Sequence, residues 1–222
     1  TAGRISLPLV LRIPYGGGIG AIEHHSESPE AYFAHTPGLK VVTCATAEDA
    51  YWMIQQAIAD DDPVVFLEPK RRYHDKGEVD TDQHSAPSSL YSARIVKPGT
   101  RATLLVYGPM VRTCVEAALV AAEEGIDLEV IDLRSLSPLD EATIIASVKR
   151  TGRAVIVHEA ARNLGMGAEI AARIQEHCLY ELEAPVLRVT GYDTPYPPSR
   201  VEEDYLPDLD RILDAVDRTV NG

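Results

Sequence analysis

The sequence has few cysteines and no long apolar run. Its three cysteines, Cys44, Cys114 and Cys178, are widely separated and form no CxxC pair, so neither a disulfide framework nor a cysteine zinc site is supported. No apolar stretch approaches the ~20 residues of a membrane span, and the start lacks the charged, apolar and small-residue succession of a signal peptide. We therefore expect a cytoplasmic protein with reduced thiols in or near its core.

Basic residues are also scarce. Lys and Arg number 21 against 34 Asp and Glu, which gives a formal net charge of -13. Binding to nucleic acid or to an anionic membrane needs basic side chains that neutralise phosphates, so a basic protein is the expected partner instead. With 222 residues, 45% of them hydrophobic, the chain is long enough to bury a core in one large domain or two small ones.

An initiator methionine is missing too. The chain begins with Thr1, and a strand pattern, LPLVLRIPY at residues 7–15, follows almost at once. We expect a fragment of a longer polypeptide.

Strand and helix patterns alternate in the first third of the chain. LKVVTC at 39–44 and PVVFLEP at 63–69 are further strand patterns. A short helix is predicted over 29–34, with Ser28 as its cap and Pro29 at its first position. A longer helix is predicted over about 47–60, capped by Thr46, because apolar residues recur there at three-and-four spacing.

Residues 74–93 contain charge, Pro, Gly and Ser but no apolar period, which predicts a linker between a domain at 1–73 and a domain at 94–222. Beyond the linker, strands at 102–108, 127–133, 154–159 and 185–191 alternate with helices. The first of these helices ends at Gly125 and carries an apolar stripe expected in the core: Val111, Val115, Ala118, Leu119 and Ala122. The alternation predicts an α/β fold with an open, mostly parallel sheet.

A glycine-rich turn followed by two histidines, GGGIGAIEHHSES at 16–28, lies at the end of the first strand. Ligands of open α/β sheets gather at such ends, and an imidazole there can relay a proton; the alternative is a plain turn with solvated imidazoles. His24 and His25 would face opposite sides of an extended backbone, and neither has a partner at zinc-site spacing. Ser26 and Ser28 lack the GxSxG setting of an activated nucleophile.

Other candidates carry weaker signals. His158 and Glu159 end a strand and could line a crevice, although a satisfied strand-end histidine is the simpler interpretation. Residues 165–167 (GMG) form a tight entry into a helix, where phosphate binding would need a basic side chain and only Arg162 is near. The acidic run at 60–62 lacks the ligand spacing of a calcium loop, although its carbonyls could hold a monovalent ion.

These residues resemble a known family. IPYGGGIGAIEHHSESPEAYFAHTPGLKVVTCATAEDA and AIADDDPVVFLEPKRRYH are similar to the beta subunit of thiamine-diphosphate-dependent 2-oxoacid dehydrogenase decarboxylase components, in the transketolase-like superfamily. LEVIDLRSLSPLD, VIVHEAARNLGMGAEIAARI and VTGYDTPYPPSRVEEDYLP resemble that family's C-terminal domain. The resemblance implies the C-terminal half of a pyrimidine-binding domain followed by a whole transketolase C-terminal domain.

The resemblance also implies the site residues. The histidine of the family's HSQSPEA motif falls on His25, which would assist acyl transfer at the cofactor's thiazolium end, with His24 as a neighbour of that site. A structural potassium ion would bind the backbone carbonyls of Ala57, Asp60 and Asp62. The glutamate that activates the aminopyrimidine lies upstream of these residues, and the diphosphate and magnesium belong to the alpha subunit, so the fragment alone should be inactive.

The implied reaction is oxidative decarboxylation of a 2-oxoacid with reductive acylation of lipoamide. HSESPEAYFAH and FLEPKRRYH favour a branched-chain substrate such as 3-methyl-2-oxobutanoate, with pyruvate or acetoin dehydrogenase, transketolase, deoxyxylulose phosphate synthase or a non-catalytic assembly module as alternatives. The implied assembly is an alpha2-beta2 heterotetramer that recruits a lipoyl acyltransferase through its basic binding domain. Three acidic residues are candidates for that docking surface: Asp208, Asp210 and Asp214.

Overall fold

The first part of the chain forms a four-stranded sheet. The structure, a computed structural model, describes residues 4–82 and 85–222. Its first sheet has the order β1 (Val10–Tyr15), β3 (Val64–Pro69), β2 (Lys40–Thr43) and β7 (Ser135–Ser137). The first three strands are parallel, while β7 comes from the second half of the chain and pairs antiparallel with β2. The helices of this part are α1 (Glu23–Ser26), α2 (Glu30–Ala34) and α3 (Ala47–Ile58).

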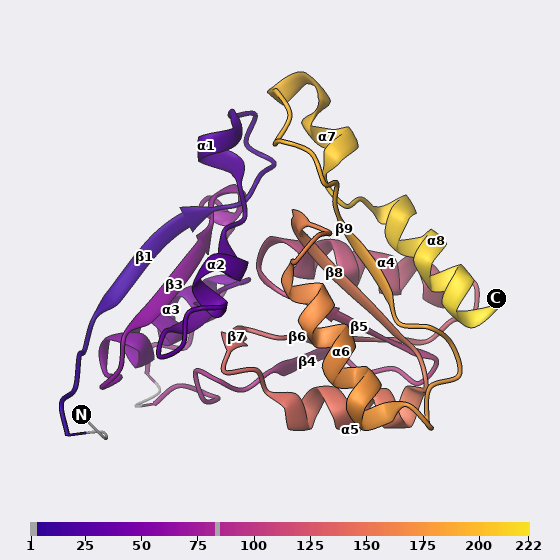
Figure 1. The fold of residues 1–222 in the computed structure, drawn as a ribbon, viewed down its shortest axis with the longest axis horizontal. Helices are drawn as coiled ribbons and strands as arrows, with labels where there is room; N and C mark the ends of the chain where they lie inside the picture. Colours follow the sequence, from indigo (N-terminus) through magenta and orange to yellow (C-terminus); the bar gives the residue numbers. More distant parts are fainter. Residues whose placement is uncertain (1–3, 83–84) are drawn as a thin grey trace.

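The second part forms a five-stranded sheet. Its order is β4 (Arg94–Lys97), β6 (Leu128–Asp132), β5 (Ala102–Val106), β8 (Ala154–Ala161) and β9 (Leu187–Gly191), and all neighbours are parallel except β4 and β6. The helices are α4 (Val111–Glu123), α5 (Glu141–Thr151), α6 (Met166–Cys178), α7 (Glu202–Tyr205) and α8 (Leu209–Val220), with short 3-10 turns at Gly108–Met110 and Ser199–Val201. A further 3-10 turn, Lys70–Arg72, directly follows β3 in the first part. Figure 1 shows the two sheets side by side.

Helices cover both faces of the second sheet. Leu104 and Val106 of β5 pack in one cluster with α4 and α8, whereas Leu105 packs in another with α5 and α6. Successive side chains of a strand point to opposite faces, and a parallel sheet with both faces covered needs a continuous apolar strand. The sequence ATLLV meets that need. The expected α/β fold with mostly parallel sheets is confirmed.

The two sheets share one hydrophobic cluster. Tyr15 and Leu67 of the first sheet pack in the same buried group as Leu105 and Ile131 of the second. The polar side of the contact includes Arg134, which is buried and pairs with Asp49 on α3 at 3.3 Å. The halves of the chain are therefore joined by packing as well as by β7.

Several local predictions are confirmed. Thr46 accepts the Asp49 amide at 3.1 Å and so caps α3, and Gly125, with φ +80°, follows the end of α4. The three cysteines are free and buried, and burial raises the pKa of the Cys44 thiol to about 12. Within the described ranges, no helix combines the length and apolar character needed to cross a membrane.

The predicted core stripe of α4 is right at Val111 and Ala118, which are buried, and in part at Val115, which packs against the core cluster, but it is wrong at Leu119 and Ala122. Leu119 is 57% exposed, and Ala122 is exposed as well. The buried face begins at Val111 and continues with small residues: Cys114, Ala117, Ala118 and Ala121. Small side chains let this helix lie close to α8 and to the sheet, while Leu119 and Val120 point outward. The short antiparallel strands β4 and β7 were not predicted either, because three or four residues carry too little period to recognise.

Candidate functional site

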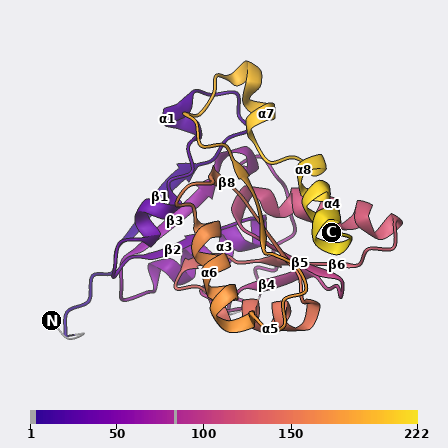
Figure 2. The same ribbon diagram turned by 45° about the vertical axis from the view of Figure 1, so that its right-hand side comes forward.

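The glycine turn, residues 16–20, follows β1 directly at the carboxyl end of the strand. Gly16, Gly18 and Gly20 have φ values of +83°, +79° and +69°, which L side chains rarely adopt. The turn leads into α1, and both views of the ribbon place α1 beside α7 of the second half (Figures 1 and 2). The turn therefore lies at the end of the strand, as predicted from the sequence. Its neighbour, α7, comes from far along the chain.

His24 and His25 lie in the single helical turn of α1. The prediction that they lie in an extended segment is therefore wrong. Both are exposed, and their ring centroids are 4.2 Å apart at an angle of 44°. The two imidazoles therefore lie on one side of the loop, because adjacent residues of a helix are separated by about 100° rather than 180°. His24 Nδ1 is 3.9 Å from a carboxylate oxygen of Glu23.

The loop that carries His25 is held at its base. Gly16 donates its amide to the carbonyl oxygen of Glu27 at 3.1 Å, which closes residues 16–27 into a compact loop. The Lys70 ammonium, directly after β3, donates to the carbonyl oxygen of His25. Partial burial lowers the pKa of Lys70.

Ser28 does not take the predicted role, whereas Ser26 agrees with the expectation that neither serine is an activated nucleophile. Helix α2 begins at Glu30, with Pro29 as its N-cap residue and without a side-chain cap, so the predicted capping by Ser28 is wrong. The Ser26 hydroxyl is buried and has no hydrogen-bond partner in the described structure. No described contact links it to a histidine or an acid, so an activated serine is not supported.

Glu30 is a buried carboxylic acid that sequence reasoning missed. It accepts a hydrogen bond from the Tyr107 hydroxyl at 2.7 Å, while its other oxygen has no partner in the described structure. Burial raises the pKa of Glu30 to about 7. The signal in the sequence was slight, since an acid at the start of a helix is usually solvated.

His158 is a buried strand-end histidine, as the simpler of the two predictions expected, but only one of its ring nitrogens is satisfied, since Nδ1 has no hydrogen-bond partner in the described structure. Its Nε2 accepts the Gly167 amide at 3.1 Å, and its ring stacks on Tyr107 with centroids 5.9 Å apart. Burial lowers the pKa of His158 to about 4. A Cβ on Gly165 or Gly167 would collide with the backbone of Ala161 or with the imidazole, so these glycines allow close packing of α6.

Glu159 reaches from β8 to the glycine turn. Its Oε2 accepts the Gly17 amide at 3.1 Å, and its Oε1 lies 2.6 Å from Nη2 of Arg71. Glu202 on α7 makes the corresponding contacts with the next part of the turn, accepting the amides of Gly18 at 3.0 Å and Gly20 at 2.8 Å. Glu159 was a weak candidate, and sequence reasoning missed Glu202 because nothing distinguishes it from the neighbouring acids.

The predicted potassium turn lies at the other end of the first sheet, before β3 rather than after β1. The carbonyl oxygen of Ala57 accepts the Asp60 amide at 3.3 Å. Lys40 Nζ lies 2.6 Å from Asp60 Oδ1 and 3.1 Å from Asp62 Oδ2, so a cation already meets both carboxylates. Among the described residues no cluster of three or more His, Cys, Asp or Glu could hold a metal, and potassium binding through carbonyls stays a prediction.

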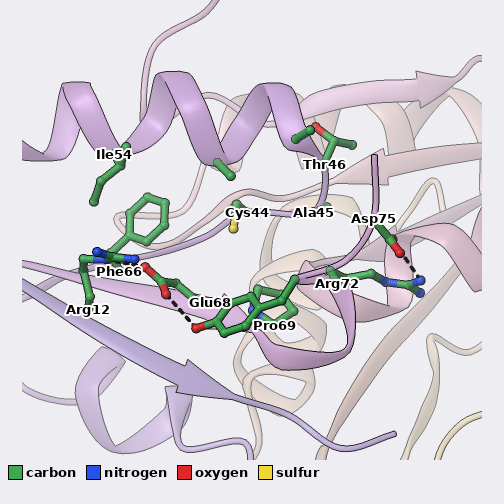
Figure 3. A pocket seen from close by; sticks show the side chains of 13 residues that line it. Arg12, Cys44, Ala45, Thr46, Ile54, Phe66, Glu68, Pro69, Arg72 and Asp75 are labelled. Carbon is green, nitrogen blue, oxygen red and sulfur yellow. Dashed lines mark hydrogen bonds and ion pairs between the residues drawn. The ribbon is translucent and has the colours of Figure 1, made fainter. Parts of the chain in front are cut away.

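A pocket of about 440 Å³ lies between α3 and β3 (Figure 3), and no residue of the glycine turn lines it. Arg12 donates to Glu68 at 2.5 Å, and Arg72 pairs with Asp75 at 3.3 Å. The Tyr73 hydroxyl donates to the second oxygen of Glu68 at 2.8 Å. The charged groups that line the pocket thus pair with one another, and we assign it no function.

Two family models match the chain. Residues 1–76 match the transketolase pyrimidine binding domain, and residues 92–212 match the transketolase C-terminal domain. A solved structure titled as an inactive beta4 tetramer of a split gene transketolase aligns with a TM-score of 0.80 at 22% identity, over 97% of this chain and 67% of that chain. At that identity the likeness shows the fold alone.

Curated relatives match at higher identity. The pyruvate dehydrogenase E1 component subunit beta of Leifsonia xyli is 56% identical over 99% of this chain and 64% of its own length. The 3-methyl-2-oxobutanoate dehydrogenase subunit beta of Mycobacterium tuberculosis is 53% identical over 99% and 63%, and the 2-oxoisovalerate dehydrogenase subunit beta of Pseudomonas aeruginosa is 46% identical over 99% and 66%. The chain therefore belongs to the transketolase-like family, and within it resembles the beta subunits of 2-oxoacid dehydrogenases.

Proposed function

We propose that the full-length protein is the beta subunit of a thiamine-diphosphate-dependent 2-oxoacid dehydrogenase, which decarboxylates a 2-oxoacid and acylates lipoyl groups together with an alpha subunit. Its relatives named as such beta subunits support the proposal. The observation that carries it is the position of His25: an exposed imidazole on a loop at the carboxyl end of parallel strands, where α/β proteins bind their ligands.

The residues of this chain fit one side of a cofactor site. Thiamine diphosphate, when bound, supplies the carbanion chemistry that breaks the bond to the carboxylate. His25 then acts as the general acid that gives a proton to the lipoyl sulfur released when the lipoyl disulfide opens. The pyrimidine-activating glutamate is expected upstream, and the diphosphate and magnesium on the alpha subunit.

Replacing His25 tests the proposal. In the full-length protein assembled with its alpha subunit, His25→Ala should abolish most acylation of a lipoyl domain while decarboxylation with an artificial electron acceptor continues. The matched control is His35→Ala, which removes an exposed imidazole outside this loop and should retain acylation. If His25→Ala leaves every rate unchanged, the chain is an assembly module that recruits partners without taking part in the reaction.

We propose a branched-chain 2-oxoacid as the substrate, on the resemblance of HSESPEAYFAH and FLEPKRRYH to branched-chain members. Relatives named for 3-methyl-2-oxobutanoate and for pyruvate are almost equally similar to this chain. The decisive measurement compares kcat/KM for 3-methyl-2-oxobutanoate and for pyruvate in the assembled enzyme. A higher value for pyruvate would replace the branched-chain assignment.

We also propose an alpha2-beta2 assembly, in which the acidic end of this chain binds the basic domain of the acyltransferase. Asp210 and Asp214 are exposed on α8, and Asp214 lines a groove of about 260 Å³ together with Asp217 and Glu124. Asp208 is less suited to a test because it caps α8 through the Arg211 amide at 2.8 Å. Asp210→Lys with Asp214→Lys should weaken binding and reduce its salt dependence; calorimetry with equal affinities would exclude this surface.

A further inference from the structure

Glu202 holds three hydrogen-bond donors at once. Its Oε1 accepts the Gly18 amide at 3.0 Å and the Tyr196 hydroxyl at 2.6 Å, and its Oε2 accepts the Gly20 amide at 2.8 Å. The residue is buried. Burial alone would raise the pKa of Glu202, but the hydrogen bonds from Tyr196, Gly20 and Gly18 outweigh it and lower that pKa, so the group holds these donors as a carboxylate.

The glycines of the turn let other side chains of the protein pack closely against its backbone. Gly17 has no room for a side chain, because a Cβ there would overlap the Tyr196 hydroxyl, and a Cβ on Gly18 would come within 2.8 Å of Cδ of Arg71. Close approach of a ligand to backbone amides is a common reason for glycine. Here the groups that approach are the Tyr196 hydroxyl, which itself donates to Glu202, and the Arg71 side chain.

A second carboxylate, Glu159, fixes the start of the same turn. It accepts the Gly17 amide and pairs with Arg71, which follows β3. The turn is therefore held by Glu159 and Glu202 from the second half of the chain, and Arg71 from the first half packs against it. Both ribbon views show the α7 segment beside α1 (Figures 1 and 2).

Movement of the turn would be passed on to His25. The loop is closed by the bond from Gly16 to Glu27, and the His25 amide donates to the Ile22 carbonyl oxygen at 3.0 Å. These two hydrogen bonds restrain the backbone between the turn and the imidazole. A displacement of about 1 Å at a reacting group can cost on the order of 100-fold in rate.

We propose that Glu202 is a positioning residue that acts through His25, fixing the glycine turn so that the imidazole stands at the site of acyl transfer. Glu159 and Arg71 provide the second point of attachment. This inference rests on the proposed function of His25, and it assigns to α7 a role in the reaction that the contacts of His25 itself do not reveal.

The first test measures the loop without catalysis. In the full-length protein with its alpha subunit, hydrogen exchange of peptides that cover residues 16–27 should become at least about tenfold faster in Glu202→Ala, because the amides of Gly18 and Gly20 lose their acceptor. The matched control is Glu203→Ala, which removes the adjacent exposed acid and should leave exchange unchanged. Equal protection in all three proteins would overturn the proposal.

The second test is a double-mutant cycle with His25. Glu202→Ala should lower the kcat of lipoyl acylation by about 10- to 100-fold and change decarboxylation with an artificial acceptor by less than about twofold. In the His25→Ala background the same change should have no further effect, because a positioning residue has nothing left to position. A purely structural role predicts the same loss in both backgrounds, and that result would refute the inference.

Two outcomes separate this inference from the proposed function. If His25→Ala itself leaves acylation intact, the proposed function fails, whatever Glu202 does. If His25→Ala abolishes acylation and Glu202→Ala leaves it intact, only the positioning role fails. Should the alanine variant not assemble, Glu202→Gln keeps the shape of the side chain but cannot accept both amides, and the same cycle with that variant decides the question.

Discussion

Arg71 and Glu159 form a buried ion pair, with Nη2 and Oε1 2.6 Å apart, that links the end of β3 to β8 of the other sheet. The Arg71 side chain is 18% exposed and that of Glu159 3%. Burial raises the pKa of Glu159, although Arg71 counteracts it. The pair thus joins the two halves of the chain next to the glycine turn, whose Gly17 amide donates to Glu159.

Removing one partner of this pair should be costly. We expect Arg71→Ala to lower the free energy of unfolding by about 3 to 5 kcal/mol, since it leaves a buried carboxylate without its cation. The double variant Arg71→Met with Glu159→Gln should recover most of that loss, because no unpaired charge remains and the glutamine oxygen can still accept the Gly17 amide. Urea unfolding measures both; a double variant as unstable as the single one would contradict this explanation.

Glu30 should make stability fall as the pH rises. Its pKa of about 7 in the folded chain lies above the ordinary value of 4.5, so the folded state holds the proton more tightly than the unfolded state. The stabilisation that this tighter proton binding gives the folded state is fully present below pH 4.5 and is lost as the pH rises through about 7. As the pH rises from 4.5 to 8, the free energy of unfolding of Glu30→Gln should therefore increase by about 3 kcal/mol relative to that of the natural sequence.

The check on Glu30 is urea unfolding at several pH values, with Glu124→Gln, a change at an exposed acid, as the control. The stability difference between Glu30→Gln and the natural sequence should widen with pH, whereas the control difference should stay constant. Parallel curves for all three proteins would show that Glu30 ionises normally.

His158 should have the opposite effect at acid pH. Burial lowers the pKa of its imidazole from 6.5 to about 4, so the unfolded state binds the proton first and stability is lost as the pH falls from 6.5 towards 4. His158→Gln, whose side-chain oxygen can accept the Gly167 amide, should remove about 3 kcal/mol of this dependence. Thermal melts between pH 4 and 7 measure it, with exposed His35→Gln as the comparison; an unchanged slope would argue for a solvated imidazole.

Truncation of Leu104 and of Leu119 should differ sharply. Leu104 is fully buried between helices α4 and α8, and its replacement by alanine should cost about 2 to 5 kcal/mol. Leu119→Ala, on the exposed side of α4, should stay within about 0.5 kcal/mol. Denaturant unfolding of the two variants measures both losses in the free energy of unfolding. If Leu119 were in the core, as the sequence pattern suggested, Leu119→Ala would lose as much stability as Leu104→Ala or more.

Local patterns account for much of what the sequence predicted. Thr46 and Gly125 mark helix ends because capping depends on neighbouring residues. The contacts that shape the site could not be predicted from local patterns. Gly18 and Glu202 are 184 residues apart, and no periodicity within either segment indicates that they meet.

The helical turn of α1 shows the same limit at short range. Four residues of EHHS are too few for a helical period, so an extended backbone was an equally reasonable expectation. The residues that flank His25 resemble a family and so predict its role, whereas the loop around it is held by contacts of Lys70 and Glu27 that no local pattern indicates.

Strand β7 has a consequence for how the chain folds during synthesis. Because β2 pairs with Ser135–Ser137, the first sheet stays incomplete until the ribosome has released more than half of the described chain. Until then the outer edge of β2 presents unpaired amides and carbonyls to any other strand. A nascent chain that stalls between residues 94 and 134 would therefore expose this edge, and chaperones that shield such edges should engage the protein in that interval.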